Sequence, residues 1–212
     1  MPKDGAPTRE IILDTAQALI FQHGFTATTL DRVLKAVGLT KGAFFYHFKN
    51  KDDLALALVE RYLQGEVTML EDWIARAEKF SRDPLQQIFI INGLMIEAID
   101  DGTPLRDGCL FASYAIEFAE FDAQTRAIAC TGFQVWRKMI GAKMAEAIEK
   151  HPPILPTKAD DLAETMLAMF EGGMVISKLD NDVNAITRKM KTFNDYLELL
   201  FGISEADDAE GK

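Results

Sequence analysis

The sequence predicts an all-α protein, and three observations predict it. Apolar residues recur with helical spacing in each long segment, Gly and Pro fall between these segments, and no stretch alternates polar and apolar residues as a strand would. We expect about nine helices and find no internal repeat. With 212 residues, 48% of them hydrophobic, the chain is long enough to bury a sizeable core.

The first predicted helix begins at Thr8 and ends at Gly24. One face of it carries Ile12, Ala16, Leu19, Ile20 and His23. A second, short helix covers residues 30–37, because Leu30, Val33, Leu34 and Val37 form one apolar stripe. Thr28 and Asp31 have the spacing of a capping box, which places its start.

Gly38 ends this short helix, since a helix C-terminus often needs a residue that accepts positive φ. Thr40 follows two residues later and can cap a third helix. Helix, short glycine-containing turn and helix together are the outline of a helix-turn-helix. On the third helix Phe44 and Phe48 face one way, and Phe45 and Tyr46 are expected to face outward.

Charge agrees with this outline. Residues 32–51 contain five Lys or Arg and no Asp or Glu, inside a chain of net charge −10. Residues 1–53 carry seven basic and six acidic side chains, whereas the remainder carries 16 and 27. A basic end can therefore meet phosphates while the acidic body is repelled from them.

The segment LTKGAFFYHFKNKDDL resembles the recognition-helix signature of the TetR family of bacterial transcriptional regulators. The resemblance extends back through AVGL and TTLDRVL and covers about the first quarter of the chain. It implies an N-terminal three-helix DNA-binding domain, a helical ligand-binding domain, a homodimer, and repression that a small molecule relieves. Relatives commonly have Tyr at the position of Phe45, so one phosphate-reaching hydroxyl is missing here.

A double-stranded DNA operator is the expected partner. Side chains expected to position phosphates are those of Thr28 or Thr29, Tyr46, His47 and Lys51. Residues expected nearest the base edges are Thr40, Lys41, Gly42 and Ala43, with Phe45 beside them on the same surface. In a dimer, two such helices would enter successive major grooves roughly 34 Å apart.

The body of the chain is expected to be a helical bundle. Asn50 can cap a long helix that runs toward Ala77 with a possible break near Gly65, and Pro84 suits the first turn of the next helix. A polar loop at 100–108 precedes CLFASYAIEFAEF, Asp122 opens another long helix, HPPILP breaks it, and two helices follow at 158–179 and 183–201. We therefore expect a DNA-binding domain at 1–53, a ligand-binding and dimerisation domain at 54–203, and an acidic tail at 204–212.

A ligand pocket in the bundle is expected to use aromatic side chains, which are core residues by default but line pockets as well. The candidate ligand-binding residues are Cys109, Phe111, Tyr114, Phe118, Phe133, Trp136 and Phe170. Glu97 and Glu117 stand in apolar surroundings and are either solvated or turned inward to bind a cation or a hydroxyl.

Cys109 has two interpretations. It either fills core or, in the first turn of a helix and near Arg106, has a lowered pKa and reacts with electrophiles. The run RDGCLFASYAIEFAE also resembles a TetR-family subset with Gly-Cys-Leu, some members of which sense electrophiles or oxidants through a cysteine. Cys130, in the middle of a helix, is expected to be packed.

The last two helices are expected to form a dimer interface, although both could instead be buried within one chain. The candidate interface residues are Leu162, Met166, Met169, Phe170, Gly173, Ile186, Met190, Phe193, Leu197 and Leu200. The adjacent Gly172 and Gly173 would permit close helix approach.

Enzyme classes fit poorly, because the three His residues lack metal-ligand spacing and no phosphate loop or nucleophile motif is present. No cofactor and no metal are expected. With two cysteines, no apolar run of membrane-spanning length and no signal segment, we expect a cytoplasmic protein. Two alternatives remain: a helical carrier that lost DNA binding, and a protein adaptor that uses the outward aromatic residues. The inducer, the operator, and whether the effect is repression or activation do not follow from the sequence.

Overall fold

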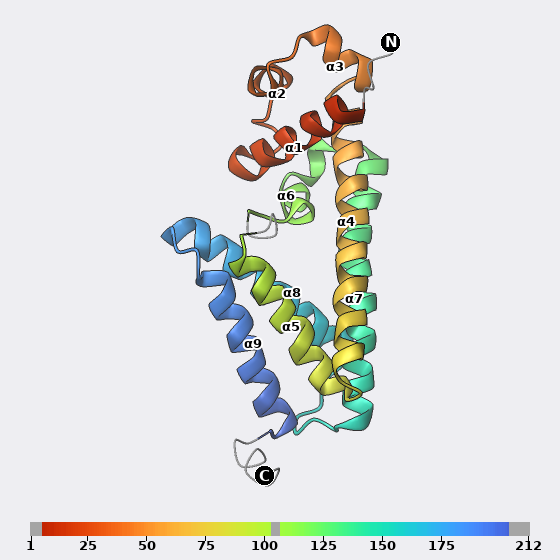
Figure 1. Cartoon of the computed structure of the whole chain (residues 1–212), viewed down its shortest axis with the longest axis vertical. Coiled ribbons are helices and arrows are strands. Elements are labelled where there is room, and N and C mark those ends of the chain that lie inside the picture. Colours follow the sequence, from red (N-terminus) through yellow and green to blue (C-terminus); the bar gives the residue numbers. More distant parts are fainter. Residues whose placement is uncertain (1–5, 103–106, 204–212) are drawn as a thin grey trace. The chain divides into compact units, whose positions relative to one another are not determined.

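The structure is a computed structural model that describes residues 6–102 and 107–203. These residues form nine α-helices and one 3₁₀ helix, with no strand among them (Figure 1). The helices are α1 (Ala6–His23), α2 (Leu30–Val37), α3 (Lys41–His47), α4 (Lys51–Phe80), α5 (Pro84–Asp100), α6 (Leu110–Ile116), η2 (Phe118–Glu120), α7 (Ala123–Lys150), α8 (Ala159–Asp180) and α9 (Ala185–Phe201). The all-α prediction is confirmed. The predicted acidic tail at 204–212 and Arg106 lie outside the described residues.

The chain divides into two compact units, which are described separately. The first contains residues 1–67 and 107–133, and the second contains residues 68–106 and 134–212. Helices α4 and α7 each contribute residues to both units. The predicted functional boundary near residue 53 stays a prediction.

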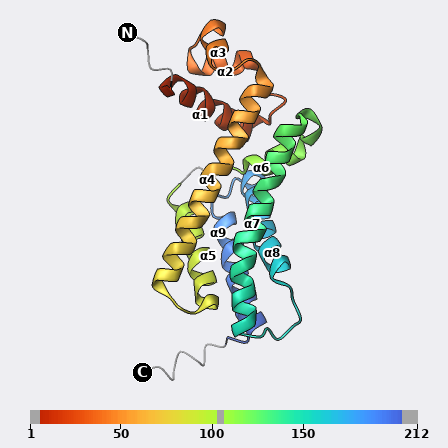
Figure 2. The same ribbon diagram turned by 90° about the vertical axis from the view of Figure 1, so that its right-hand side faces the viewer.

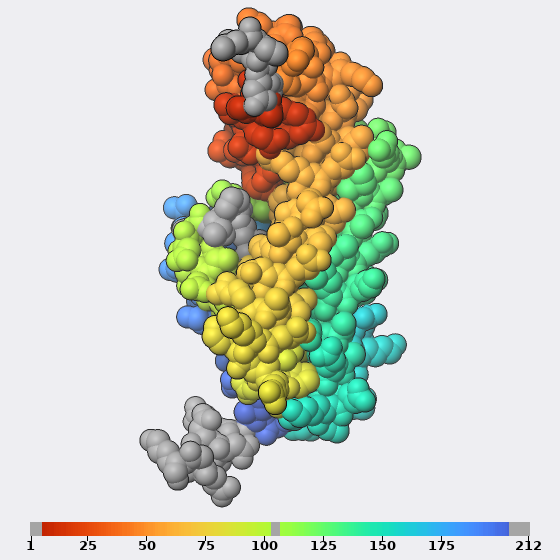
Figure 3. Space-filling model, turned by 45° about the vertical axis from the view of Figure 1, so that its right-hand side comes forward, coloured from red at the N-terminus to blue at the C-terminus, as the bar shows by residue number. Residues whose placement is uncertain are grey.

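The first unit is built on one apolar core beneath α1, α2 and α3. Ile12, Ala16 and Ile20 of α1 are buried with Val33 and Leu34 of α2, Phe44 of α3, Phe48, and Leu54 and Leu58 of α4. In Figure 3 the surfaces of α1 and of the α2–α3 segment, coloured red to orange, are in continuous contact. The predicted three-helix core is therefore confirmed.

Two helix starts in this unit differ from the prediction. The N-cap of α2 is Thr29, whose side chain accepts a hydrogen bond from the Arg32 N–H, and not Thr28. Helix α1 begins at Ala6 and not at Thr8. Several residues near each start have capping side chains, and the sequence alone does not rank them.

Helix α4 begins as predicted and then runs without the possible break near Gly65. The Asn50 side-chain oxygen accepts a hydrogen bond from the Asp53 N–H at 2.8 Å, which caps the first turn. The helix continues for 30 residues through Gly65. An internal glycine costs about 1 kcal/mol but removes no backbone hydrogen bond, so the helix tolerates it.

The second unit packs α5, α8 and α9 together (Figure 2). Helix α5 has buried residues on several faces. A Cβ on Gly173 of α8 would lie 2.9 Å from the Ile186 Cα of α9, so the absence of a side chain lets these two helices approach closely. Within the described residues no helix is long and apolar enough to cross a bilayer.

The predicted dimer-interface residues are buried inside this single chain. Nine of the ten are buried and Met169 is half-buried, which corrects the prediction: Leu162, Met166, Met169, Phe170, Gly173, Ile186, Met190, Phe193, Leu197 and Leu200. The apolar faces of α8 and α9 pack against helices of their own chain. A second copy of the chain is therefore not needed to bury them. Exposed apolar side chains on the same helices are Val175, Leu179, Tyr196 and Leu199.

Candidate nucleic-acid interface and ligand pocket

The turn between α2 and α3 is closed by contacts within a few residues of it. Gly38 has φ +68°, and the Leu39 N–H donates to the Leu34 carbonyl oxygen. The Thr40 hydroxyl oxygen accepts from the Ala43 N–H and caps α3. The helix-turn-helix outline and both predicted end residues are confirmed.

Helix α3 turns its two aromatic pairs in opposite directions, as predicted. Phe44 and Phe48 are buried, whereas Phe45 is 52% and Tyr46 is 78% exposed. The Phe44 and Phe48 rings lie 5.4 Å apart in the core and fix the rotation of α3 about its axis. An exposed aromatic pair is thus held rigidly on the surface of the basic segment.

Most residues predicted to meet DNA lie on the surface of this unit. Thr29, Thr40, Lys41, Gly42, Phe45 and Tyr46 are exposed, and Ala43 and His47 are half-buried. Thr28 is 2% exposed, and its hydroxyl donates to the Gly24 carbonyl oxygen at 2.8 Å. Of the two threonines at the start of α2, only Thr29 is therefore open to a phosphate.

Lys41 forms an ion pair with a neighbouring acidic side chain. Its Nζ lies 3.0 Å from the Asp31 carboxylate of α2, and both side chains are largely exposed. An exposed pair of this kind contributes about 0–1 kcal/mol. Lys41 can therefore leave Asp31 for a base or a phosphate at small cost.

Lys51 holds the α1–α2 turn, a role that the sequence did not predict. Its Nζ donates to the Phe25 carbonyl oxygen at 2.6 Å and to the Thr26 carbonyl oxygen at 3.4 Å. The same ammonium lies 4.0 Å from the centroid of the Phe25 ring. Burial lowers the pKa of Lys51 below its ordinary value, against the opposing effect of the nearby Glu117 carboxylate.

Glu117 holds the opposite side of the same two peptide units. Its carboxylate accepts from the Phe25 N–H at 2.6 Å, from the Thr26 N–H at 2.8 Å and from the Thr26 hydroxyl. Burial raises the pKa of Glu117, but the hydrogen bonds from Thr26 and Phe25 and the charge of Lys51 outweigh it, so the pKa lies below its ordinary value. Glu117 thus binds a hydroxyl of its own chain. Glu97 is solvated and lies 3.9 Å from Arg76.

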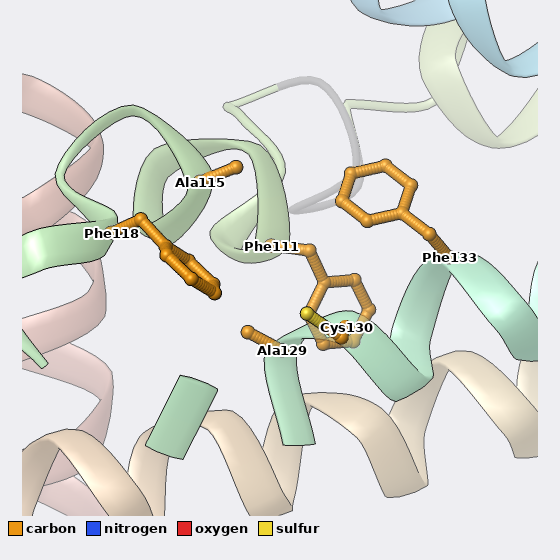
Figure 4. A pocket seen from close by; sticks show the side chains of 6 residues that line it. All are labelled: Phe111, Ala115, Phe118, Ala129, Cys130 and Phe133. Atoms are coloured by element: carbon orange, nitrogen blue, oxygen red, sulfur yellow. The ribbon is translucent and has the colours of Figure 1, made fainter. Parts of the chain in front are cut away.

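Three predicted ligand residues come together at an apolar pocket in the first unit. The pocket opens to solvent, spans about 200 Å³ when that open space is included, and is lined by Phe111, Ala115, Phe118, Ala129, Cys130 and Phe133. Figure 4 shows the Phe118 and Ala115 side chains on the α6–η2 side and those of Ala129 and Cys130 on the α7 side. Its purely apolar lining suits an apolar molecule.

The other predicted ligand residues lie elsewhere. Tyr114 is buried and its hydroxyl donates to the Ala55 carbonyl oxygen, while the Trp136 N–H donates to the Ala163 carbonyl oxygen in the second unit. Phe170 is buried in the second unit as well. The hydroxyl of Tyr114 and the indole N–H of Trp136 are therefore both bound to main-chain carbonyl oxygens.

The two cysteines differ in exposure. Cys109 is half-buried at the N-cap of α6, where its Sγ accepts from the Ala112 N–H at 3.4 Å. Cys130 is exposed and lines the pocket, so the prediction that it is packed was wrong. Its helical position places it on the open side of α7. Among the described residues no group of three His, Cys, Asp or Glu side chains could hold a metal ion.

Comparison with known proteins agrees with this geometry. The family model described as "Bacterial regulatory proteins, tetR family" matches residues 12–58. A second, described as "Transcriptional regulator LmrA/YxaF-like, C-terminal domain", matches residues 84–192, which is just over half of the chain. The chain belongs to the TetR family of transcriptional regulators, a family of DNA-binding proteins and not of enzymes.

Particular relatives show the extent of the likeness. The uncharacterised regulator YxaF of Bacillus subtilis is 26% identical over 82% of this chain and 87% of its own length, and the repressor NemR of Escherichia coli is 23% identical over 81% and 84%. AcrR of Shigella flexneri is 33% identical, but over only 46% of this chain and 43% of its own length. A crystal structure of a TetR-family regulator from Agrobacterium tumefaciens superimposes with a TM-score of 0.77, 24% identity and coverage of 93% and 100%.

Regulators of this family typically are ligand-responsive repressors that bind DNA operators and act as dimers. These comparisons do not show the Gly-Cys-Leu subset predicted from the sequence, which stays a prediction. The helix-turn-helix at α2–α3 is the part of the chain that both the family match and the geometry single out.

Proposed function

We propose that this protein, acting in the cytoplasm, represses transcription from a palindromic operator and leaves it when a small apolar molecule occupies the Phe111–Phe133 pocket. The observation that carries the proposal is the exposed surface of α3. There Thr40, Lys41 and Gly42 face solvent beside Phe45 and Tyr46, on a helix that two buried aromatic residues hold in place. Such a surface offers donors, a cation and close backbone approach to one groove.

Fluorescence anisotropy with DNA fragments selected from a random library tests the DNA-binding part. We expect a specific site, an affinity that falls steeply with salt, and a loss of about tenfold or more in Tyr46→Ala, whose stability should not change. Phe80→Ala, an equally exposed aromatic change on α4, is the matched control. Salt-insensitive binding to a protein partner would instead identify an adaptor, and no DNA binding at all would leave the carrier alternative.

The pocket limits the class of inducer. Five apolar side chains and a thiol offer no partner for a charge, so we propose a small, uncharged and largely hydrocarbon or aromatic molecule. Thermal shift with small uncharged aromatic probes is the direct test. Ala129→Leu should fill the pocket and abolish any such shift.

The second copy of the chain is proposed to cover exposed apolar side chains on α8 and α9. Val175 and Leu179 on α8 and Tyr196 and Leu199 on α9 are exposed although large and apolar, and Leu179 and Leu199 are each close to 80% exposed. Leu199→Glu should shift the sedimentation of the protein toward the monomer. Leu155→Glu, an exposed apolar change in the 151–158 segment, is the control.

A thiol-based sensor remains a second candidate, because the Cys109 Sγ lies at the N-cap of α6 and accepts an N–H hydrogen bond there. In that case Cys109→Ser keeps operator binding and loses release by thiol-reactive agents. If release persists in Cys109→Ser but disappears in Cys130→Ser, the reactive thiol is that of Cys130 in the pocket.

A further inference from the structure

The α1–α2 turn is gripped from both sides by side chains far from it in sequence. Glu117 accepts from the N–H groups of Phe25 and Thr26, and Lys51 donates to the carbonyl oxygens of the same two residues. Glu117 is 91 residues from Thr26, and Lys51 is 25. We name this arrangement, Glu117 and Lys51 on the peptide units of Phe25 and Thr26, the turn clamp.

The turn itself is shaped to admit the carboxylate. Gly24 has φ +82°, and a Cβ there would lie 2.6 Å from the Glu117 Oε1. Gly24 therefore meets two requirements: it adopts a left-handed conformation, and its lack of a side chain leaves room for the Glu117 carboxylate. Thr28, whose hydroxyl donates to the Gly24 carbonyl oxygen, continues this bonded network to the residue before the N-cap of α2.

The clamp begins at the wall of the pocket. Glu117 is the residue between α6 and η2, and the residues on either side of this junction, Ala115 and Phe118, both line the pocket. Figure 4 shows Phe118 directed across the pocket toward α7. A molecule that enters between Phe118 and Cys130 contacts this junction directly.

We infer that Glu117 is the positioning residue through which occupancy of the pocket changes the DNA-binding helices, because it ties the pocket wall to the turn that leads into α2. The regulatory role of Glu117 rests on the proposed function. The coupling between the pocket and the turn does not, since every residue involved belongs to the first unit of a single chain. An occupied pocket displaces Glu117, frees the Phe25 and Thr26 amides, and releases the start of α2.

Hydrogen exchange of the peptide covering residues 22–29 tests this without DNA and without a known inducer. In a Cys109→Ser background, benzyl methanethiosulfonate places a benzyl group on Cys130 by forming a mixed disulfide and releasing methanesulfinate. The methyl reagent, which makes the same bond without the ring, is the control. We expect the benzyl group, and not the methyl group, to speed exchange of the two amides about fivefold or more.

In Glu117→Gln both amides should exchange quickly before labelling, and the benzyl group should not increase their exchange rate further. The single side-chain oxygen of Gln cannot accept all three hydrogen bonds that the Glu117 carboxylate accepts. Glu120→Gln removes an exposed acid three residues away and should behave as wild type. If Glu117→Gln does not fold, Thr26→Val removes one donor and should show an intermediate rate.

Two results would overturn the inference: no benzyl-induced change in the Cys109→Ser protein with Glu117 intact, or the same change when Glu117→Gln is added to it. Neither depends on DNA binding. A protein that binds no DNA but shows the expected exchange would keep the turn clamp and lose the proposed function.

Discussion

The two turns of the helix-turn-helix unit are built in opposite ways. The α2–α3 turn is closed by its own residues, with Gly38 in the left-handed region and Thr40 capping α3. The α1–α2 turn also has a left-handed glycine, Gly24, but its amides and carbonyls are bound by Glu117 and Lys51. A turn that closes itself stays fixed, whereas a turn held by distant side chains can be controlled through them.

The largest effect on stability should come from replacing each of the two glycines with alanine. Gly24→Ala meets both left-handed strain and a Cβ 2.6 Å from Glu117 Oε1, whereas a Cβ on Gly38 meets nothing within 4 Å. We expect Gly38→Ala to cost about 1–2 kcal/mol of the free energy of unfolding, from strain alone. Gly24→Ala should cost at least about 1 kcal/mol more, because a charged hydrogen-bond partner is displaced as well. Equal losses in urea unfolding would contradict the comparison.

Glu117→Gln should lower the free energy of unfolding by about 1–2 kcal/mol at pH 7. The pKa of Glu117 is lowered in the folded state from an ordinary value of 4.5, so its contribution is complete above that value and is lost as the pH falls through the folded-state pKa. The difference between wild type and variant should therefore shrink in urea titrations below about pH 4.5. A difference that stays constant down to pH 3 would show that the charge of Glu117 is not involved.

Thr40→Ala should cost about 1 kcal/mol of stability, the usual loss for an N-cap that hydrogen bonds to the helix. Its effect is confined to the α2–α3 turn, so exchange at Phe25 and Thr26 should not change. Thr29→Ala, the corresponding cap of α2, is the matched variant. Faster exchange at Phe25 in Thr40→Ala would mean that the two turns are not independent.

The smallest effect sharpens the role of Lys51. If its ammonium serves the turn, Lys51→Met should weaken DNA binding without changing the slope of affinity against salt. Lys41→Met, which removes an exposed cation, should reduce that slope by about 0.9. A slope reduced equally by both variants would return Lys51 to the role of a phosphate contact that the sequence suggested.

The two turns also separate what the sequence could predict from what it could not. Gly38 and Thr40 act within five residues of their partners, so spacing alone identified the helix-turn-helix. The partners of Glu117 are more than 90 residues away, and only its apolar surroundings marked it as an acid that could face inward. Lys51 was predicted to bind DNA because a sequence shows that a side chain is charged but not which way it points.

The same limit explains the errors in the body of the chain. The apolar stripes of α8 and α9 were predicted to form a dimer interface, but a stripe does not show whether its own chain or a partner covers it, and Ile186 and Phe193 are covered by their own chain. Cys130 was expected to pack because it lies among small residues in a helix, yet it is exposed at the pocket. Phe111, Phe118 and Phe133 were identified by residue type, and the fold brought them together.

The most direct test of the account compares the DNA affinity of benzyl-labelled and methyl-labelled protein, both in the Cys109→Ser background, with Glu117 intact and with Glu117→Gln. With Glu117 intact, the benzyl group on Cys130 should weaken binding to the selected DNA site about tenfold. In Glu117→Gln, affinity should already be reduced and the benzyl and methyl forms should bind equally. A benzyl effect of the same size in both proteins would contradict the account, because the pocket would then reach the DNA-binding surface without the turn clamp.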